Sequence, residues 1–178
     1  DLFIKETVKE ITIKAGQKCT AVRRILVPED FIEEVQKGIA ARLASTVIGN
    51  LSEEGVRMGA LATRTQVDRV RASVDQLAKS QDIVFGDLDN FEVKGADKEK
   101  GAFFSPILFR NDDPYTKTDV HNIEAFGPVS TIMPYKNIDD AIELSRMGKG
   151  SLVSSIVTPS DEEGKEFVIG AASMHGRI

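Results

Sequence analysis

Gly16-Gln17-Lys18-Cys19-Thr20-Ala21 is the stretch on which the interpretation of the whole 178-residue chain depends. Before it, apolar residues recur at helical spacing from about residue 2 to 14. After it, the β-branched run 21–27, closed by Pro28, predicts a strand. The stretch therefore predicts a turn that links a first helix to a first strand.

Cys19 is the only cysteine of the chain, and two hypotheses are open for it. A lone cysteine is commonly a small buried apolar side chain. A thiol at a helix-to-strand turn can instead react as a thiolate, with backbone N–H groups facing the developing negative charge. The glycine and glutamine before it favour the nucleophile hypothesis, which predicts that Cys19 is reachable from an open face.

Helical and strand-like runs alternate along the rest of the chain, which predicts an α/β domain of three layers (αβα) with a mostly parallel sheet. We expect helix caps at Asp30 (with Glu33 in a capping box), Thr63 and Asn137. The first of these helices is expected to bury Phe31. The expected helices after the first are about 30–46, 63–79, 138–147 and 160–173, and the expected strands after the first are 82–86, 103–109, 127–135 and 152–157.

Composition limits the classes of protein to which the chain can belong. Hydrophobic residues make up 41% and charged residues 29%, as in ordinary globular domains, and a net charge of −5 argues against a nucleic-acid partner. No apolar run approaches the roughly 18 residues of a membrane span, so no membrane role is expected. The single cysteine fits a reducing cytoplasm, and no spacing of Cys, His or Asp predicts a metal site. We interpret both histidines, His121 and His175, as loop or surface residues.

Five motifs, in order, resemble the aldehyde dehydrogenase superfamily. Besides the cysteine segment they are Met58-Gly59-Ala60-Leu61 with Gln66 and Arg69, Phe103–Leu108, Glu124-Ala125-Phe126-Gly127-Pro128-Val129, and Tyr135 with Asp140–Ile142 and Gly150–Leu152. Ala60 stands where the family has proline. The resemblance is to the family's catalytic domain and implies that residues 1–178 are a single catalytic domain, a fragment of a longer chain without its cofactor-binding and oligomerisation parts.

The resemblance also implies residue roles. Cys19 would be the nucleophile, Glu124 would accept hydrogen bonds from the nicotinamide ribose of NADP or NAD, and Phe126 would pack on the same ribose. Gln66 would touch the cofactor ribose, and Arg69 would approach the adenine side. Without the resemblance, Glu124 is a solvated side chain beside a core phenylalanine, and the other two lie on the wet face of a helix. If the roles hold, Cys19 and residues 124–126 line one cleft.

Finer matches at 1–6, 14–21 and 174–178 resemble a branch of the family that acts in phenylacetate degradation, where the dehydrogenase is joined to a hydratase-like domain. This implies a CoA-linked semialdehyde substrate, NADP, and a homo-oligomeric full-length enzyme. Two alternatives stay open: a CoA-acylating semialdehyde dehydrogenase, and a non-catalytic α/β binding module. Since the general base and most cofactor contacts would lie outside these residues, we expect the isolated chain to be inactive.

Overall fold

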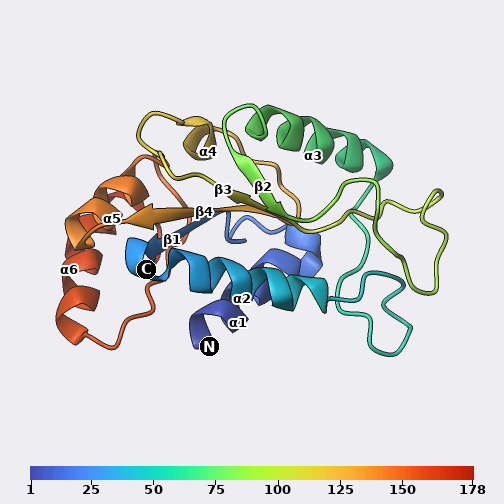
Figure 1. The fold of residues 1–178 in the computed structure, drawn as a ribbon, viewed down its shortest axis with the longest axis horizontal. Helices are drawn as coiled ribbons and strands as arrows, with labels where there is room; N and C mark the ends of the chain where they lie inside the picture. The colour runs from blue at the N-terminus through green and yellow to red at the C-terminus, as the bar shows by residue number, and fades with distance from the viewer.

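A computed structural model describes all of residues 1–178, and its centre is one four-stranded sheet (Figure 1). The strand order is β1 (Arg24–Pro28), β4 (Val129–Tyr135), β3 (Ile107–Arg110) and β2 (Asp82–Phe85). β4 pairs in parallel with both β1 and β3, whereas β2 runs antiparallel along the outer edge of β3. The prediction of a mostly parallel sheet is confirmed.

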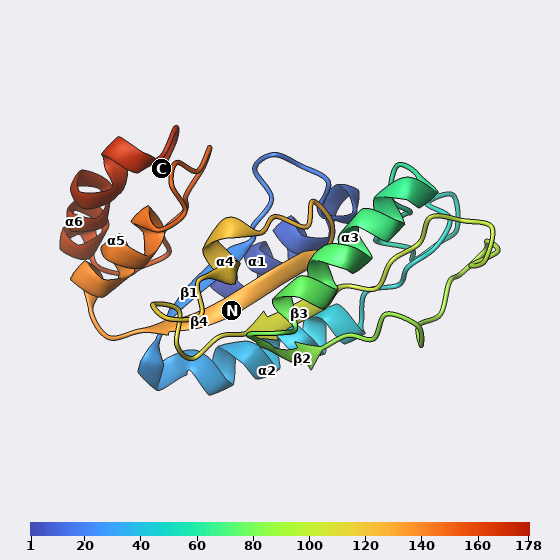
Figure 2. The same cartoon turned by 90° about the horizontal axis from the view of Figure 1, so that it is seen from above.

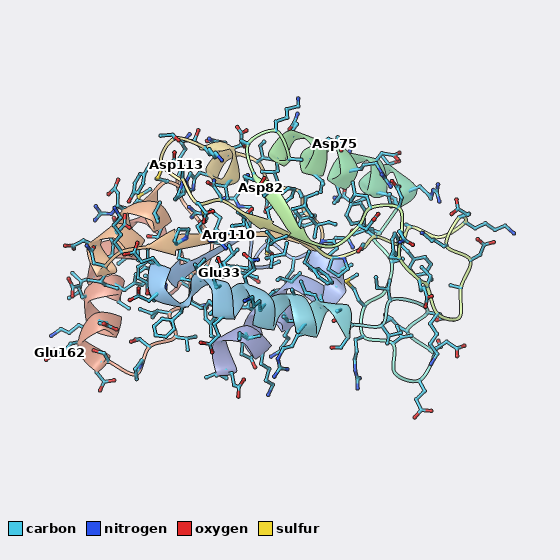
Figure 3. All side chains as sticks on the ribbon, in the orientation of Figure 1. Glu33, Asp75, Asp82, Arg110, Asp113 and Glu162 are labelled. Atoms are coloured by element: carbon cyan, nitrogen blue, oxygen red, sulfur yellow. The ribbon has the colours of Figure 1, made fainter.

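Two helices, α1 (Leu2–Thr12) and α2 (Ile32–Ala44), cover one face of the sheet (Figure 1). Each helix turns an apolar stripe toward the strands, as amphipathic surface helices do. The apolar cluster between them consists of Val8, Ile11, Ile25, Val27, Ile32, Ile39, Leu43, Leu108 and Ile132. On this side Arg110, at the end of β3, pairs with Glu33 of α2 and with Asp112 (Figure 3).

The other face carries α3 (Arg64–Leu77) and the single turn α4 (Asp119–Asn122) (Figure 1). Thr63 caps α3 as predicted, because its hydroxyl accepts a hydrogen bond from the Gln66 N–H at 3.1 Å. Val70, Val74 and Leu77 of α3 are buried in a cluster with Ile107, Phe109 and Val129 of the sheet region. Helices on both faces confirm the three-layer αβα prediction.

A pair of helices, α5 (Ile138–Arg146) and α6 (Asp161–Ala171), packs together at one end of the molecule, far from α3 (Figure 2). Ile142 of α5 and Phe167 and Ala171 of α6 form a small separate core. The predicted cap at Asn137 is confirmed, since its side chain accepts from the Asp140 N–H at 3.0 Å. No helix in the chain combines the length and the apolar character that a membrane crossing needs.

The predicted strand 152–157 is wrong. Leu152 is 60% exposed and Val157 49% exposed, and the segment joins no strand of the sheet. Its backbone meets only the end of the chain, through Ser151 N–H to Met174 C=O (3.0 Å) and Ser154 N–H to Arg177 C=O (2.9 Å). A strand-like composition is not sufficient, because a strand forms only where an adjacent strand is available for backbone hydrogen bonding.

Several predicted boundaries also differ. A 3₁₀ turn, Glu29–Phe31, precedes α2, no side-chain cap forms at Asp30, and Phe31 is 55% exposed rather than buried. The Glu33 carboxylate forms an ion pair with Arg110, and the predicted capping box does not form. The strand expected from Phe103 begins only at Ile107, directly after Pro106, which has no N–H for a ladder.

Candidate active site

The chain between α1 and β1 makes a sharp reversal that presents Cys19. Lys14, Ala15 and Gly16 have φ values of 52°, 51° and 70°, so three consecutive residues adopt left-handed backbone. Only glycine adopts that conformation without steric cost, and Gly16 is the last of the three. The loop then closes through the Lys18 N–H to Gly16 C=O bond (3.0 Å) and the Ala21 N–H to Lys18 C=O bond (2.9 Å).

Cys19 is exposed at the tip of this loop, in the place that the sequence predicted. Its backbone N–H donates to no acceptor within the chain. The loop is held on α1 by an ion pair between Lys18 Nζ and Glu10 Oε2 at 2.6 Å. A thiol with a free backbone N–H beside it has the parts needed for addition to a carbonyl group and for holding the resulting oxyanion.

The cysteine loop packs directly on the segment 124–127. A Cβ on Gly16 would overlap the carbonyl oxygen of Gly127 and lie 2.7 Å from the Pro128 nitrogen. Gly127 is constrained too, though less severely, since a Cβ there would lie 2.8 Å from a side-chain methyl group of Val70 in α3. The absence of a side chain at both glycines therefore allows three segments distant in sequence to touch.

One narrow pocket runs along this contact, and it is lined from both sides. Its walls are Gly16, Lys18, Ala21, Val22 and Arg23 from the loop, and Glu124, Ala125, Phe126, Gly127 and Val129 from the facing segment. Cys19 itself is not among the lining residues, although it lies in the same loop between Lys18 and Ala21. The structure thus brings the cysteine loop and the segment 124–126 to a shared cleft, with the Cys19 side chain outside its lining.

Within the facing segment, Glu124 and Phe126 are exposed while Ala125 between them is buried. Phe126 has a φ of 51°, a strained value for a residue with a side chain, and the residue is 41% exposed. The burial of Ala125 and the left-handed turn keep the side chains of Glu124 and Phe126 at the surface. A carboxylate and an aromatic face suit a ribose diol and a flat ring.

The two predicted residues of α3, Gln66 and Arg69, differ in their contacts. The Gln66 amide donates from Nε2 to the carbonyl oxygen of Phe126 at 3.0 Å, which joins α3 to the segment 124–127. Arg69, one turn further along α3, is exposed, and its side chain makes no hydrogen bond or ion pair. Gln66 is therefore bonded to a residue that lines the cleft, although neither Gln66 nor Arg69 lines it directly.

Gln17 belongs to the same arrangement but received no role from the sequence. Its Oε1 accepts the Ala62 N–H at 2.9 Å, and its Nε2 donates to the Lys14 carbonyl at 3.2 Å. Its place directly after Gly16 was the available signal, but the partner at Ala62 could not be identified from spacing.

His121 corrects the prediction of a surface histidine, because it is only 4% exposed. Its Nε2 contacts the Pro114 carbonyl at 2.9 Å and therefore carries the proton, so Nδ1 accepts from Arg24 Nη1 at 3.0 Å. Burial lowers the pKa of His121, and the neighbouring Arg24 lowers it further. Burial also lowers the pKa of Arg24 to about 10, while its guanidinium donates to the carbonyls of Leu144 and Ser145.

A larger surface hollow lies between α5 and α6, at the far end of the molecule from α3 (Figure 2). It is lined mostly by charged side chains, including Glu162, which Figure 3 places on the outer side of α6. None of the residues that line it has left-handed backbone, and none belongs to the cysteine loop or to the segment 124–127. The smaller cleft, by contrast, is lined by residues of both. No group of three or more His, Cys, Asp or Glu side chains is placed to hold a metal ion.

The chain is similar to known proteins along most or all of its length. A model of the aldehyde dehydrogenase family matches residues 1–171. Over its whole length the chain is 39% identical to 3,4-dehydroadipyl-CoA semialdehyde dehydrogenase of Aromatoleum evansii, and it spans 35% of the length of that protein. A stretch of 122 residues, which makes up 68% of the chain, is 42% identical to protein MaoC of Klebsiella aerogenes. The match covers 35% of the length of that protein.

Solved structures share the fold. The structure of betaine aldehyde dehydrogenase from Staphylococcus aureus in complex with NAD+ matches 98% of this chain with a TM-score of 0.88 at 21% identity. An aldehyde dehydrogenase from Bacillus cereus matches with a TM-score of 0.85 at 23% identity. In each case the chain covers about a third of the other protein, 33% of both these structures.

Proposed function

This chain belongs to the aldehyde dehydrogenase family, and from that premise we propose that it supplies the nucleophile and part of the cofactor cleft of an NAD(P)-dependent enzyme that oxidises an aldehyde to a carboxylic acid. One observation carries the proposal: an exposed Cys19 loop is packed, glycine on glycine, against a segment that presents Glu124 and Phe126 to the same pocket. In our proposal residues 1–178 are a single catalytic domain of a longer protein, since the relatives it matches are about three times as long.

The residues of the cleft fit a nicotinamide cofactor. Glu124 offers an exposed carboxylate to ribose hydroxyl groups, and the half-exposed ring of Phe126 offers a flat apolar surface beside it. We propose that α3 completes this side of the cofactor site, with Arg69 exposed on the helix and Gln66 bonded to the Phe126 carbonyl. NAD(P) would supply the hydride acceptor, and most of its contacts would come from outside these residues.

In the proposed mechanism the Cys19 thiolate adds to the aldehyde carbonyl and forms a thiohemiacetal. The free backbone N–H of Cys19 donates to the oxyanion as it forms. Hydride loss leaves a thioester on Cys19, which water hydrolyses. The family resemblance places the general base outside residues 1–178, so we assign this proton transfer to a residue there.

For the substrate we propose a CoA-linked semialdehyde of the phenylacetate pathway. The support is the 39% identity to 3,4-dehydroadipyl-CoA semialdehyde dehydrogenase across the entire chain. We further propose a cytoplasmic location and a homo-oligomeric complete enzyme, by analogy with the branch of the family that the sequence resembles.

The test uses the complete enzyme and three variants. Cys19→Ser is expected to lower aldehyde-dependent reduction of NAD(P) by about 10³-fold or more, because the covalent step is lost. Glu124→Gln is expected to slow hydride transfer while iodoacetamide still alkylates Cys19 at the normal rate. The matched control is Glu162→Gln on α6, which should change neither.

Two outcomes would overturn the proposal. Cys19→Ser with normal turnover would exclude the nucleophile. A product that forms only with added free CoA, as an acyl-CoA thioester, would favour the acylating alternative.

A further inference from the structure

We infer that Gln66 is a positioning residue, which acts on the cofactor only by holding Phe126 in place; this rests on the proposed function of the cleft. The amide donates from Nε2 to the Phe126 carbonyl at 3.0 Å. The family resemblance implies a direct contact between Gln66 and the ribose. That bond commits one of the two Nε2 protons to the chain and fixes the direction in which the amide points, so the two roles have to be separated by experiment.

Phe126 needs such a restraint because its own backbone preference opposes its conformation. A φ of 51° is disfavoured for a residue with a Cβ, so the left-handed turn persists only if its surroundings impose it. The Gln66 bond fixes the orientation of the peptide group between Phe126 and Gly127. That peptide group links the residue that carries the ring to Gly127, whose carbonyl oxygen lies against Gly16.

The first turn of α3 is itself anchored, so Gln66 has a rigid base. The backbone N–H of Gln66 donates to the Thr63 hydroxyl at 3.1 Å. Next to the cap, the Ala62 N–H donates to Gln17 Oε1 at 2.9 Å, and the Leu61 N–H donates to the Ala102 carbonyl at 2.8 Å. Gln17 therefore ties the cysteine loop to the base from which Gln66 holds Phe126.

Direct contact and positioning make different predictions in a double-mutant cycle. Gln66→Met keeps the length of the side chain and removes the donor. If Gln66 acts through the Phe126 ring, its replacement matters only while that ring is present. A direct ribose contact would be lost equally with or without the ring.

The experiment measures equilibrium binding of NADP and NAD to the complete enzyme, together with KM for the cofactor and the alkylation rate of Cys19 by iodoacetamide. We expect Gln66→Met to weaken cofactor binding and raise KM about tenfold, the worth of one hydrogen bond at the upper end of the usual range. Alkylation should stay within about twofold, because the Cys19 loop keeps its own hydrogen bonds. In a Phe126→Ala background the same substitution should change binding by less than about twofold.

Gln76→Met is the matched control, since Gln76 is exposed on the same helix and its side chain makes no hydrogen bond. If Gln66→Met does not fold, Gln66→Glu serves in the same cycle, because a carboxylate has the length but not the donor. Equal losses with and without Phe126, or no loss in either background, would overturn the positioning role. An unsubstituted enzyme that binds neither nucleotide would instead refute the proposed function.

Discussion

Gly16→Ala tests the contact on which the cleft depends. Gly16 has two separate reasons to lack a side chain: its φ is 70°, and a Cβ would overlap backbone atoms of Gly127. Gly55 has only the first reason, because its φ is 83° but a Cβ there would meet nothing within 4 Å. Gly55→Ala is therefore the matched control.

The magnitudes follow from these two sites. Left-handed backbone costs an alanine about 1–2 kcal/mol, and Gly55→Ala should lose about that much free energy of unfolding. At Gly16 the obstructing atoms belong to the backbone, which cannot rotate away, so an overpacking cost of about 1–3 kcal/mol is added. Gly16→Ala should therefore lose about 2–5 kcal/mol.

The assay is equilibrium urea unfolding of the 178-residue chain followed by circular dichroism. In the complete enzyme, alkylation of Cys19 should also change in Gly16→Ala and not in Gly55→Ala, because only the first displaces the cysteine loop. Equal losses of stability in the two variants would refute the reasoning, since they would mean that Gly16 and Gly127 do not touch.

Two further predictions concern stability. Because the pKa of His121 is lowered in the folded chain, protonation favours the unfolded chain; the free energy of unfolding should stay level above about pH 6.5 and fall as the pH drops below it. His121→Gln should weaken this dependence of the unfolding free energy on pH, measured by urea unfolding at a series of pH values. Part of the dependence should persist because the pKa of His175 is lowered as well. An unchanged pH dependence would count against a buried neutral histidine at position 121. Asn137→Ala should cost about 0.5–2 kcal/mol in the same assay through loss of the α5 cap, while Asn90→Ala in an exposed loop should cost little, and equal costs would contradict the capping role.

Local signals identified much of the fold. The caps at Thr63 and Asn137 were predictable because each bond joins a side chain to an N–H three residues on. The loop position of Cys19 followed from the helix and strand patterns on either side. By contrast, the expected strand 152–157, the expected capping box at Asp30 and the surface position of His121 were wrong, and in each case a distant partner, or the lack of one, decided the outcome.

The sequence by itself determined the order of the helices and strands apart from α4 and the expected strand 152–157, the glycine before the cysteine loop and the residues that resemble a dehydrogenase site. Only the tertiary structure decided that Gly16 rests on Gly127, that Gln66 bonds to the Phe126 carbonyl and that Gln17 reaches Ala62. The reason is physical. Helix propensity and capping act over three or four residues and depend on near neighbours in the chain, whereas these contacts join residues 45 to more than 100 positions apart, brought together by the burial of apolar side chains on both faces of the sheet.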